Sequence, residues 1–197
     1  MKLLSAIPKH HLFFMGLLAL LISGCASPTE SKPEAAEEET SAVNPNYEIA
    51  PQEYSDLAVK SLTSWMNLDF EGWTSTMSDD VVFYFPDGDS GTRTELVGKE
   101  AVLDWWNNWE QTSGIQSMTY SNHVEIPIIA KDTMAYSNLT GVFVITYFSN
   151  ELMYNETSVK LRMNIAVHFN SDNLIDRIYS YYDRSKIIQA MGINILE

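Results

Sequence analysis

Long runs of β-branched and aromatic residues in the second half of the chain constrain its fold more than any other feature. Lys-Asp, Asn-Glu and Ser-Asp-Asn turn signals divide this half into four predicted strands, at residues 118–130, 133–148, 152–169 and 173–182. Within residues 159–169 the odd-numbered positions are all apolar, whereas most even-numbered positions are polar, so one face of that strand is predicted to be buried. Strands this long predict a curled antiparallel sheet.

Helical spacing dominates the part of the chain before these strands. Apolar side chains three and four residues apart predict a helix over residues 52–70, and residues 68–77 predict a second, short one. Residues 81–85 predict a strand that ends in the turn Pro-Asp-Gly. Helical spacing returns in residues 99–111, which carry three of the five tryptophans. Helices followed by strands predict an α+β domain with its helices on one face of the sheet.

The folded part must be held together by packing, because Cys25 is the only cysteine in the chain. Residues 51–197 are long enough to form one domain with its own core. They contain 20 acidic and 9 basic residues, a net charge of −11. Such a surface repels phosphate backbones and anionic headgroups, so we expect no nucleic-acid partner, and any membrane association must come from another source.

The N-terminus supplies that source. Lys2 and Lys9 precede an unbroken apolar block of 11 residues at 12–22, the length of a signal-peptide core and too short to span a bilayer. The sequence Leu-Ile-Ser-Gly-Cys that ends it resembles the lipobox of bacterial lipoproteins, which implies cleavage before Cys25 and lipid on that residue. The alternatives are an uncleaved anchor or cleavage elsewhere. Residues 1–24 are therefore predicted to be a lipoprotein signal peptide.

The segment after the cysteine predicts a tether. Residues 25–50 are rich in Pro, Ser, Thr, Ala and Glu and offer almost nothing to bury, so we expect disorder there and a folded domain over residues 51–197. Ala26 and Ser27 stand where the inner-membrane retention signal of enteric lipoproteins would place an aspartate. This resemblance favours the outer membrane within the bacterial cell envelope, without indicating which side of it the domain faces.

Three segments of the folded part resemble the SnoaL-like polyketide cyclase group of the nuclear-transport-factor-2-like (NTF2-like) superfamily. They are the opening helix pair running into Ser-Asp-Asp-Val-Val-Phe-Tyr-Phe-Pro at 78–86, Gly-Lys-Glu-Ala-Val at 98–102 leading to two tryptophans, and Leu-Ile-Asp-Arg-Ile at 174–178 continuing to Gln-Ala-Met-Gly at 189–192. The resemblance covers about residues 52–193. It implies a cone-shaped antiparallel sheet around N-terminal helices, an apolar pocket in the cone, and homodimers in many members.

The resemblance predicts the architecture better than the chemistry, because this superfamily includes several kinds of enzyme and many non-catalytic members. Steroid-isomerase-like members place an aspartate before the strand-ending proline, where this chain has Phe85. Epoxide-hydrolase-like members carry an Arg-x-Asp triplet on a middle strand, and residues 135–139 contain none. Both chemistries are therefore disfavoured here.

In the cyclase-like arrangement a histidine and an aspartate flank the ligand, and His168 and Asp183 occupy the corresponding places. Burial of Asp183 in an apolar cavity would raise its pKa and make it a stronger base. Two structural interpretations compete with this one. An aspartate before residues 184–188 is a favoured helix cap, and His168 belongs to the polar phase of its strand, which faces away from the cone.

Aromatic residues are the candidates for ligand contact, although the tryptophans of residues 99–111 also fit a helix core. The predicted ligand-binding residues are Tyr84, Trp105, Tyr147 and Tyr182. His123 and Glu125 point the same way on a predicted strand but lack a third ligand, so we predict no metal site. The chain has no glycine-rich phosphate loop, and we expect no cofactor.

Two functions remain open at this level. The first is a membrane-tethered domain that binds a small, mostly apolar molecule in its cone, with proton transfer by Asp183 as an option. The second is a non-catalytic module that acts through dimerisation or partner contacts.

Overall fold

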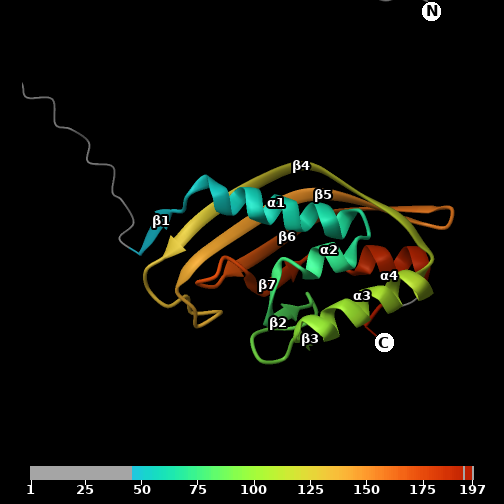
Figure 1. The fold of residues 1–197 in the computed structure, drawn as a ribbon. Coiled ribbons are helices and arrows are strands. Elements are labelled where there is room, and N and C mark those ends of the chain that lie inside the picture. The colour runs from blue at the N-terminus through green and yellow to red at the C-terminus, as the bar shows by residue number, and fades with distance from the viewer. Residues whose placement is uncertain (1–45, 193, 197) are drawn as a thin grey trace, which may run out of the picture. The chain divides into compact units, whose positions relative to one another are not determined.

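A computed structural model describes residues 46–192 and 194–196 (Figure 1). The predicted signal peptide and Cys25 lie outside these residues. Among the residues that are described, no helix has the length and apolar character needed to cross a membrane. The elements, in chain order, are β1 (Tyr47–Ile49), α1 (Gln52–Met66), α2 (Phe70–Thr74), β2 (Met77–Tyr84), β3 (Glu95–Val97), α3 (Lys99–Ser113), β4 (Ile115–Ala130), β5 (Gly141–Tyr154), β6 (Thr157–Phe169), β7 (Ile175–Tyr181) and α4 (Ser185–Met191).

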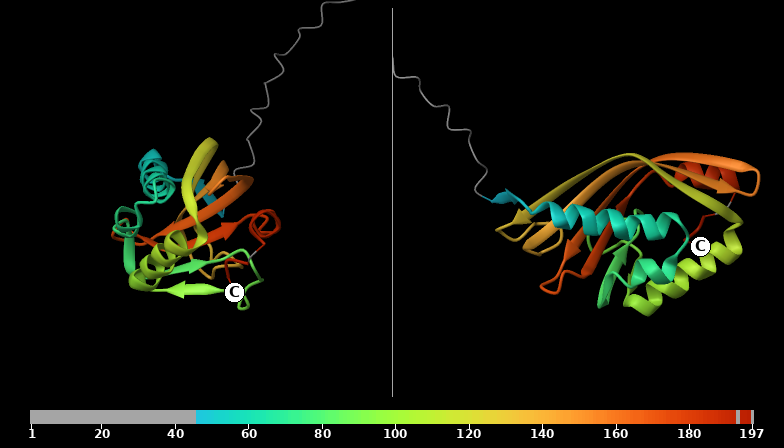
Figure 2. Two further views of the ribbon diagram at one scale, coloured as in Figure 1. Left: turned by 90° about the vertical axis from the view of Figure 1, so that its right-hand side faces the viewer. Right: turned by 45° about the horizontal axis from the view of Figure 1, so that its top comes forward.

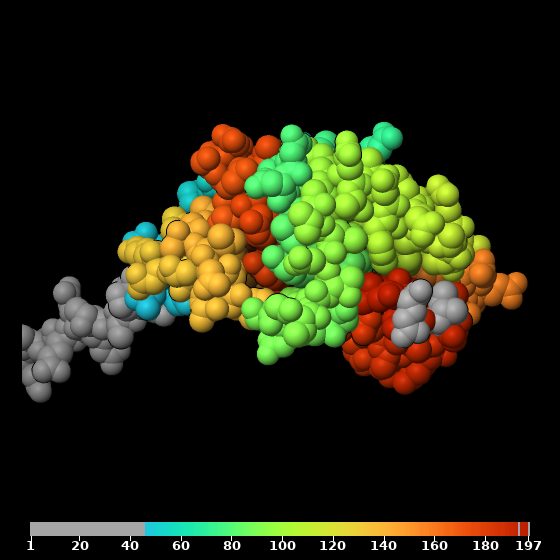
Figure 3. All heavy atoms as spheres, turned by 90° about the horizontal axis from the view of Figure 1, so that it is seen from below, coloured from blue at the N-terminus to red at the C-terminus, as the bar shows by residue number. Residues whose placement is uncertain are grey.

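The described strands form one seven-stranded sheet in the order β1-β4-β5-β6-β7-β2-β3. Neighbours are antiparallel except β2 and β7, which run parallel. The sheet is curved and does not close, and α1, α2 and α3 lie under its arch (Figure 2). The prediction of an α+β domain with helices on one face of a curled sheet is confirmed. α4 packs against β6, and the C-terminal part of the chain that contains α4 lies beside α3 (Figure 3).

The concave face of the sheet forms the core with the helices. All six odd-numbered residues from Val159 to Phe169 are buried, as their alternation predicts. Trp106 of α3 lies at the centre of an aromatic cluster, since the centroids of seven other aromatic rings lie within 6.5 Å of its own. The edge-to-face contacts among these rings are favourable beyond the area that they bury. Packing of this kind stabilises a fold that has no disulfide to rely on.

One predicted turn is wrong. The chain contains two Asn-Glu pairs, at 150–151 and 155–156, and the sequence predicts the turn between the second and third strands at the first pair. In the structure Asn150 lies inside β5 opposite Leu161 of β6, and the hairpin turns at Asn155. Asn155 has a φ of +48°, a left-handed conformation that asparagine tolerates well. Its backbone N–H also donates to the carbonyl of Gly114, so tertiary contacts choose between the two pairs.

Two short edge strands have no counterpart in the sequence prediction. β1 pairs with the end of β4, so the sheet includes residues that the sequence assigns to the tether. β3 pairs with β2 between the Pro-Asp-Gly turn and the helix predicted from residue 99, where the sequence predicts no strand. Each strand is three residues long, which is too short to show a period of two. The strand predicted to begin at residue 133 begins instead at Gly141, after a loop that lies on the convex side of the sheet.

Candidate functional site

A cavity of about 20 Å³ lies between the helices and the concave face of the sheet. Space of this size holds about one water molecule. Its walls come from α1, α3, the three longest strands and the C-terminal segment. They are formed by Trp65, Trp106, Trp109, Met118, Asn150, Leu152, Tyr154, Leu161, Met163, Tyr182, Ile187 and Ile195.

Residues of this wall carry most of the unpaired buried polar atoms. The described part of the chain contains six buried side-chain N or O atoms without a hydrogen-bond partner, and five of them belong to residues of this wall. They are the indole N–H groups of Trp65, Trp106 and Trp109, the amide oxygen of Asn150 and the hydroxyl of Tyr154. These side chains are between 1% and 6% exposed. Buried polar groups in proteins are normally paired, so five unpaired ones among the residues of one wall are unusual.

Local sequence explains how these groups come together. Trp106 and Trp109 lie three residues apart on α3, and Trp65 lies on the buried face of α1. Asn150 occupies an inward-facing position of β5 between Phe148 and Leu152, both of them buried. Its amide nitrogen donates to the sulfur of Met163 at 3.3 Å, which leaves the oxygen without a donor.

The side chains around the cavity are uncharged. Its wall contains no Asp, Glu, His, Lys or Arg among the described residues. Burial raises the pKa of Tyr154, and the neighbouring Tyr182 adds to the rise, while the indole of Trp109 opposes it without forming a hydrogen bond of good geometry. Burial likewise raises the pKa of Tyr182. Both phenols are therefore neutral at ordinary pH, and the described residues of the cavity wall carry no charge.

The C-terminal segment forms one side of the cavity through Tyr182, Ile187 and Ile195. A groove of about 260 Å³ runs outside it along α3, and its walls include Trp105. Cavity and groove share Trp109 and Ile195. A displacement of this segment would therefore join the cavity to the groove and enlarge it beyond the size of a water molecule.

The structure does not bring the two predicted catalytic residues together at this cavity. Asp183 is exposed, and its carboxylate accepts the backbone N–H of Ser185 at the start of α4 at 3.0 Å. Hydrogen bonds from Ser185 lower the pKa of Asp183, which makes it a weaker base than an ordinary aspartate.

His168 lies on the convex side of the sheet and is 7% exposed. Its Nδ1 lies 2.5 Å from the carboxylate of Asp176, and its Nε2 lies 2.9 Å from the carbonyl of Thr140. Both ring nitrogens are thus engaged within the protein. The strand phase that aims His168 away from the cone accounts for this position.

The predicted ligand-contact residues separate into three places. Tyr182 lines the cavity, Trp105 lines the groove beside it, and Tyr84 and Tyr147 lie on the convex face. Sequence reasoning missed the other cavity residues with unpaired atoms. For Asn150 a signal existed, namely a polar residue in the buried phase of a long strand, but the Asn-Glu pair pointed to a turn instead.

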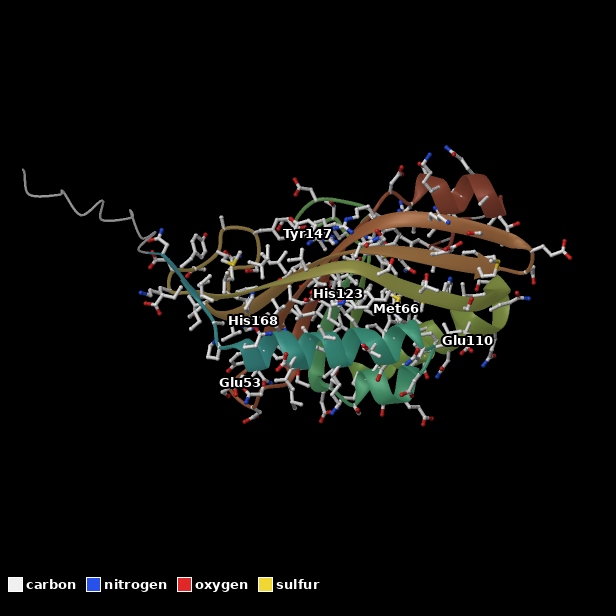
Figure 4. The ribbon with its side chains drawn as sticks, turned by 90° about the horizontal axis from the view of Figure 1, so that it is seen from above. Glu53, Met66, Glu110, His123, Tyr147 and His168 are labelled. Atoms are coloured by element: carbon white, nitrogen blue, oxygen red, sulfur yellow. The ribbon has the colours of Figure 1, made fainter. Side chains whose placement is uncertain are left out.

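His123 and Glu125 form a small cluster with Tyr120 at a bulge in β4. The Glu125 carboxylate accepts from the Tyr120 hydroxyl at 2.8 Å and lies 2.7 Å from Nδ1 of His123. Figure 4 shows His123 between β4 and α1, and Tyr147 on the side of the sheet away from that helix. Within the described residues, no group of three or more His, Cys, Asp or Glu is arranged to hold a metal ion.

No protein-family model and no curated protein matches the chain. Solved structures match its fold. A candidate isomerase from Bacillus subtilis is 20% identical with a TM-score of 0.53, covering 74% of this chain and 97% of its own. A candidate polyketide cyclase from Xanthomonas campestris is 14% identical with a TM-score of 0.55, covering 71% and 97%. A candidate SnoaL-like polyketide cyclase from Shewanella denitrificans is 10% identical with a TM-score of 0.51, covering 72% and 98%. The described domain therefore has the SnoaL-like fold.

Proposed function

We propose that this protein is a lipid-tethered SnoaL-like domain that binds a small, mostly apolar molecule in its cone without acting on it as an acid or base. The observation that carries the proposal is that five of the six unpaired buried polar atoms of the described residues belong to the wall of one cavity. The absence of charged side chains from the described cavity wall favours binding over proton transfer.

The same atoms suggest which molecule fits. Three indole N–H groups can only donate, so they favour a ligand that carries hydrogen-bond acceptors. The rest of the wall is aliphatic or aromatic, which favours an apolar body. An anion would be buried there without a counter-charge, at a cost of several kcal/mol. A neutral carbonyl compound satisfies all three conditions.

Tryptophan fluorescence tests this binding, because three of the five tryptophans line the cavity. Acetophenone, which has one carbonyl acceptor, should change the emission of the full-length protein in a saturable manner. Ethylbenzene has a similar body without the acceptor and should bind at least about tenfold more weakly. Trp109→Phe should reduce the preference for acetophenone, whereas Trp73→Phe, a buried control outside the cavity wall, should not.

Two results would contradict the proposal. Equal binding of the two compounds would show that the unpaired atoms do not select the ligand. An absence of saturable change with either compound would show that the cone remains closed to small molecules.

Tethering is the second part of the proposal, and the lipobox-like sequence before Cys25 supports it. Cells grown with labelled palmitate should incorporate label into the natural protein and not into Cys25→Ser. A protein that carries no label, or a variant that is labelled equally, would remove the tether from the proposal.

A second candidate function, homodimerisation through the convex face, rests on a separate observation. Val124, Ile126, Tyr147 and Tyr181 point to this face and are 40–48% exposed. Their exposure leaves an apolar strip of the kind found at protein–protein contacts. Light scattering across a range of protein concentrations should then detect a dimer that Tyr147→Asp abolishes, while acetophenone binding persists.

A further inference from the structure

A second cleft, separate from the cone, opens on the convex side of the sheet. Its volume is about 340 Å³, and it is lined by Tyr84, Ser90, Gly91, Arg93, Glu95, Tyr136, Ser137, Asn138 and Tyr179. The walls come from β2, β3 and β7 and from the β2–β3 and β4–β5 loops. The two loops lie beside each other in the view of Figure 3. An apolar hollow of about 200 Å³ shares Tyr136, Ser137 and Tyr179 with it. Volumes of this size accommodate small organic ligands.

Arg93 brings an uncompensated charge into this cleft. Its side chain is 9% exposed, and it donates only to neutral acceptors. These are the carbonyls of Phe85, Tyr84 and Ser180 and, from Nη1, the hydroxyl of Tyr136 at 2.9 Å. Among the described residues no carboxylate lies within 4.0 Å of the guanidinium.

The donors that remain can be counted. A guanidinium has five N–H hydrogens, and these four bonds use four of them, which leaves one hydrogen on Nη1. Burial raises the pKa of Tyr181, and hydrogen bonding from Arg93 opposes that rise, so the Tyr181 hydroxyl is a weak partner for this remaining hydrogen. The Tyr136 hydroxyl accepts from Nη1, and its own hydrogen is therefore available to a further acceptor. A charged donor that is only weakly engaged and a neutral donor thus lie side by side at the cleft.

Tyrosine rings supply the flat surface of the site. The rings of Tyr84 and Tyr179 are stacked, with centroids 4.9 Å apart and planes within 5° of each other. The guanidinium carbon of Arg93 lies 5.9 Å from the centroid of Tyr84 and 4.8 Å from that of Tyr181. A planar aromatic ligand can pack against these rings, and cation–π contacts hold the arginine among them.

We propose that this convex-face cleft binds a small aromatic carboxylate. The ring of the ligand packs beside Tyr84 and Tyr179, and its carboxylate accepts the remaining Nη1 hydrogen of Arg93, in place of the Tyr181 hydroxyl, and the hydroxyl hydrogen of Tyr136. Such charge-assisted hydrogen bonds are about twice as strong as neutral ones, and the ligand supplies the counter-charge that the buried guanidinium lacks. The site is independent of the cone and of its ligand.

Glu95 allows a test in which the substitution should strengthen the binding of an anion. Its carboxylate lines the same cleft but is exposed and forms no ion pair with Arg93. A ligand carboxylate would meet repulsion from it, moderated by solvent. Glu95→Gln removes this repulsion while preserving the shape of the side chain, so it should tighten the binding of an anion and leave a neutral ligand unaffected.

The experiment is a titration of the full-length ¹⁵N-labelled protein with benzoate, followed by NMR. Benzoate should shift the amide signals around Arg93 and Tyr179, and benzamide, its neutral counterpart, should bind at least about tenfold more weakly. Tyr136→Phe should weaken benzoate binding about fivefold, and Glu95→Gln should tighten it about two- to threefold. Tyr147→Phe, another convex-face tyrosine outside the cleft, should leave it unchanged.

Equal affinity for benzoate and benzamide would overturn the proposal, as would an absence of saturable shifts or shifts confined to the cone. Weaker benzoate binding in Glu95→Gln would also overturn it, because that result would assign the carboxylate an attractive role. Acetophenone binding in the cone is measured separately by fluorescence, so a negative result at one site does not affect the conclusion about the other.

Discussion

Replacing Asn150 by leucine should make this protein more stable, which is an unusual expectation for a buried strand residue. Asn150 is 2% exposed, and its amide oxygen has no donor. A buried polar group without a partner costs about 1–3 kcal/mol. Leucine has the same branched skeleton, and the neighbouring cavity of about 20 Å³ can absorb part of its larger volume.

The losses on substitution are smaller than the gain. The amide nitrogen of Asn150 gives up one weak hydrogen bond to the sulfur of Met163. Allowing up to about 1 kcal/mol for that bond and for strain in packing, we expect Asn150→Leu to raise the free energy of unfolding by about 1–2 kcal/mol. For a domain of this size the melting temperature should rise by about 3–6 °C.

Urea unfolding followed by circular dichroism measures the effect, with Asn164→Leu as the matched control. Asn164 lies on β6 and is half-buried, but its amide nitrogen donates to the carbonyl of Thr146 at 3.2 Å. This control shares the gain in strand propensity and loses a real hydrogen bond, so it should be destabilised by about 0.5–1.5 kcal/mol. If Asn150→Leu loses as much stability as the control, the oxygen of Asn150 already has a partner in solution, and the reasoning about the cavity is refuted.

Further predictions concern the convex face and the stability of the fold at low pH. His168→Phe removes the partner of the Asp176 carboxylate and should lower the free energy of unfolding by about 1–3 kcal/mol in urea, and an unchanged midpoint would contradict a structural role for this pair. Burial opposes ionisation of Asp87, but hydrogen bonds from Thr94 outweigh it and lower the pKa of Asp87. Asp87 therefore stabilises the fold fully above about pH 5, and this contribution is lost as the pH falls through its lowered native pKa. In an acid titration, the free energy of unfolding of Asp87→Asn should fall less steeply with decreasing pH than that of the natural protein. An identical acid transition in both proteins would show that Thr94 has no such influence.

The sequence correctly predicted which side chains are buried wherever burial follows the period of a helix or a strand. The alternation from Val159 to Phe169 identified the buried face of β6, and the spacing of tryptophans identified the buried face of α3. These predictions succeed because a regular backbone alone decides which side chains share a face. The curled sheet over helices followed from the length and order of the segments, and the structure confirms it.

Choices between locally equivalent alternatives required the tertiary structure. Both Asn-Glu pairs are acceptable turns, and only the pairing of β5 with β6 selects Asn155. Likewise, the residues near Arg93 in the sequence do not predict that its charged side chain is buried. Its bonds reach Ser180, which is 87 residues away, so the cleft exists only once β2 and β7 are paired.

The candidate site also combines features that the local sequence predicts with features that only the folded structure decides. The amino-acid sequence by itself determined that aromatic side chains would fill the cone and that Asp183 could begin a helix, since both depend on periodicity and on neighbouring residues. Only the folded arrangement decided that three indole N–H groups, one amide oxygen and one phenol would meet without partners. Those five groups come from α1, α3 and β5, and the unmet hydrogen bonds between them are a property of packing, which no single segment contains.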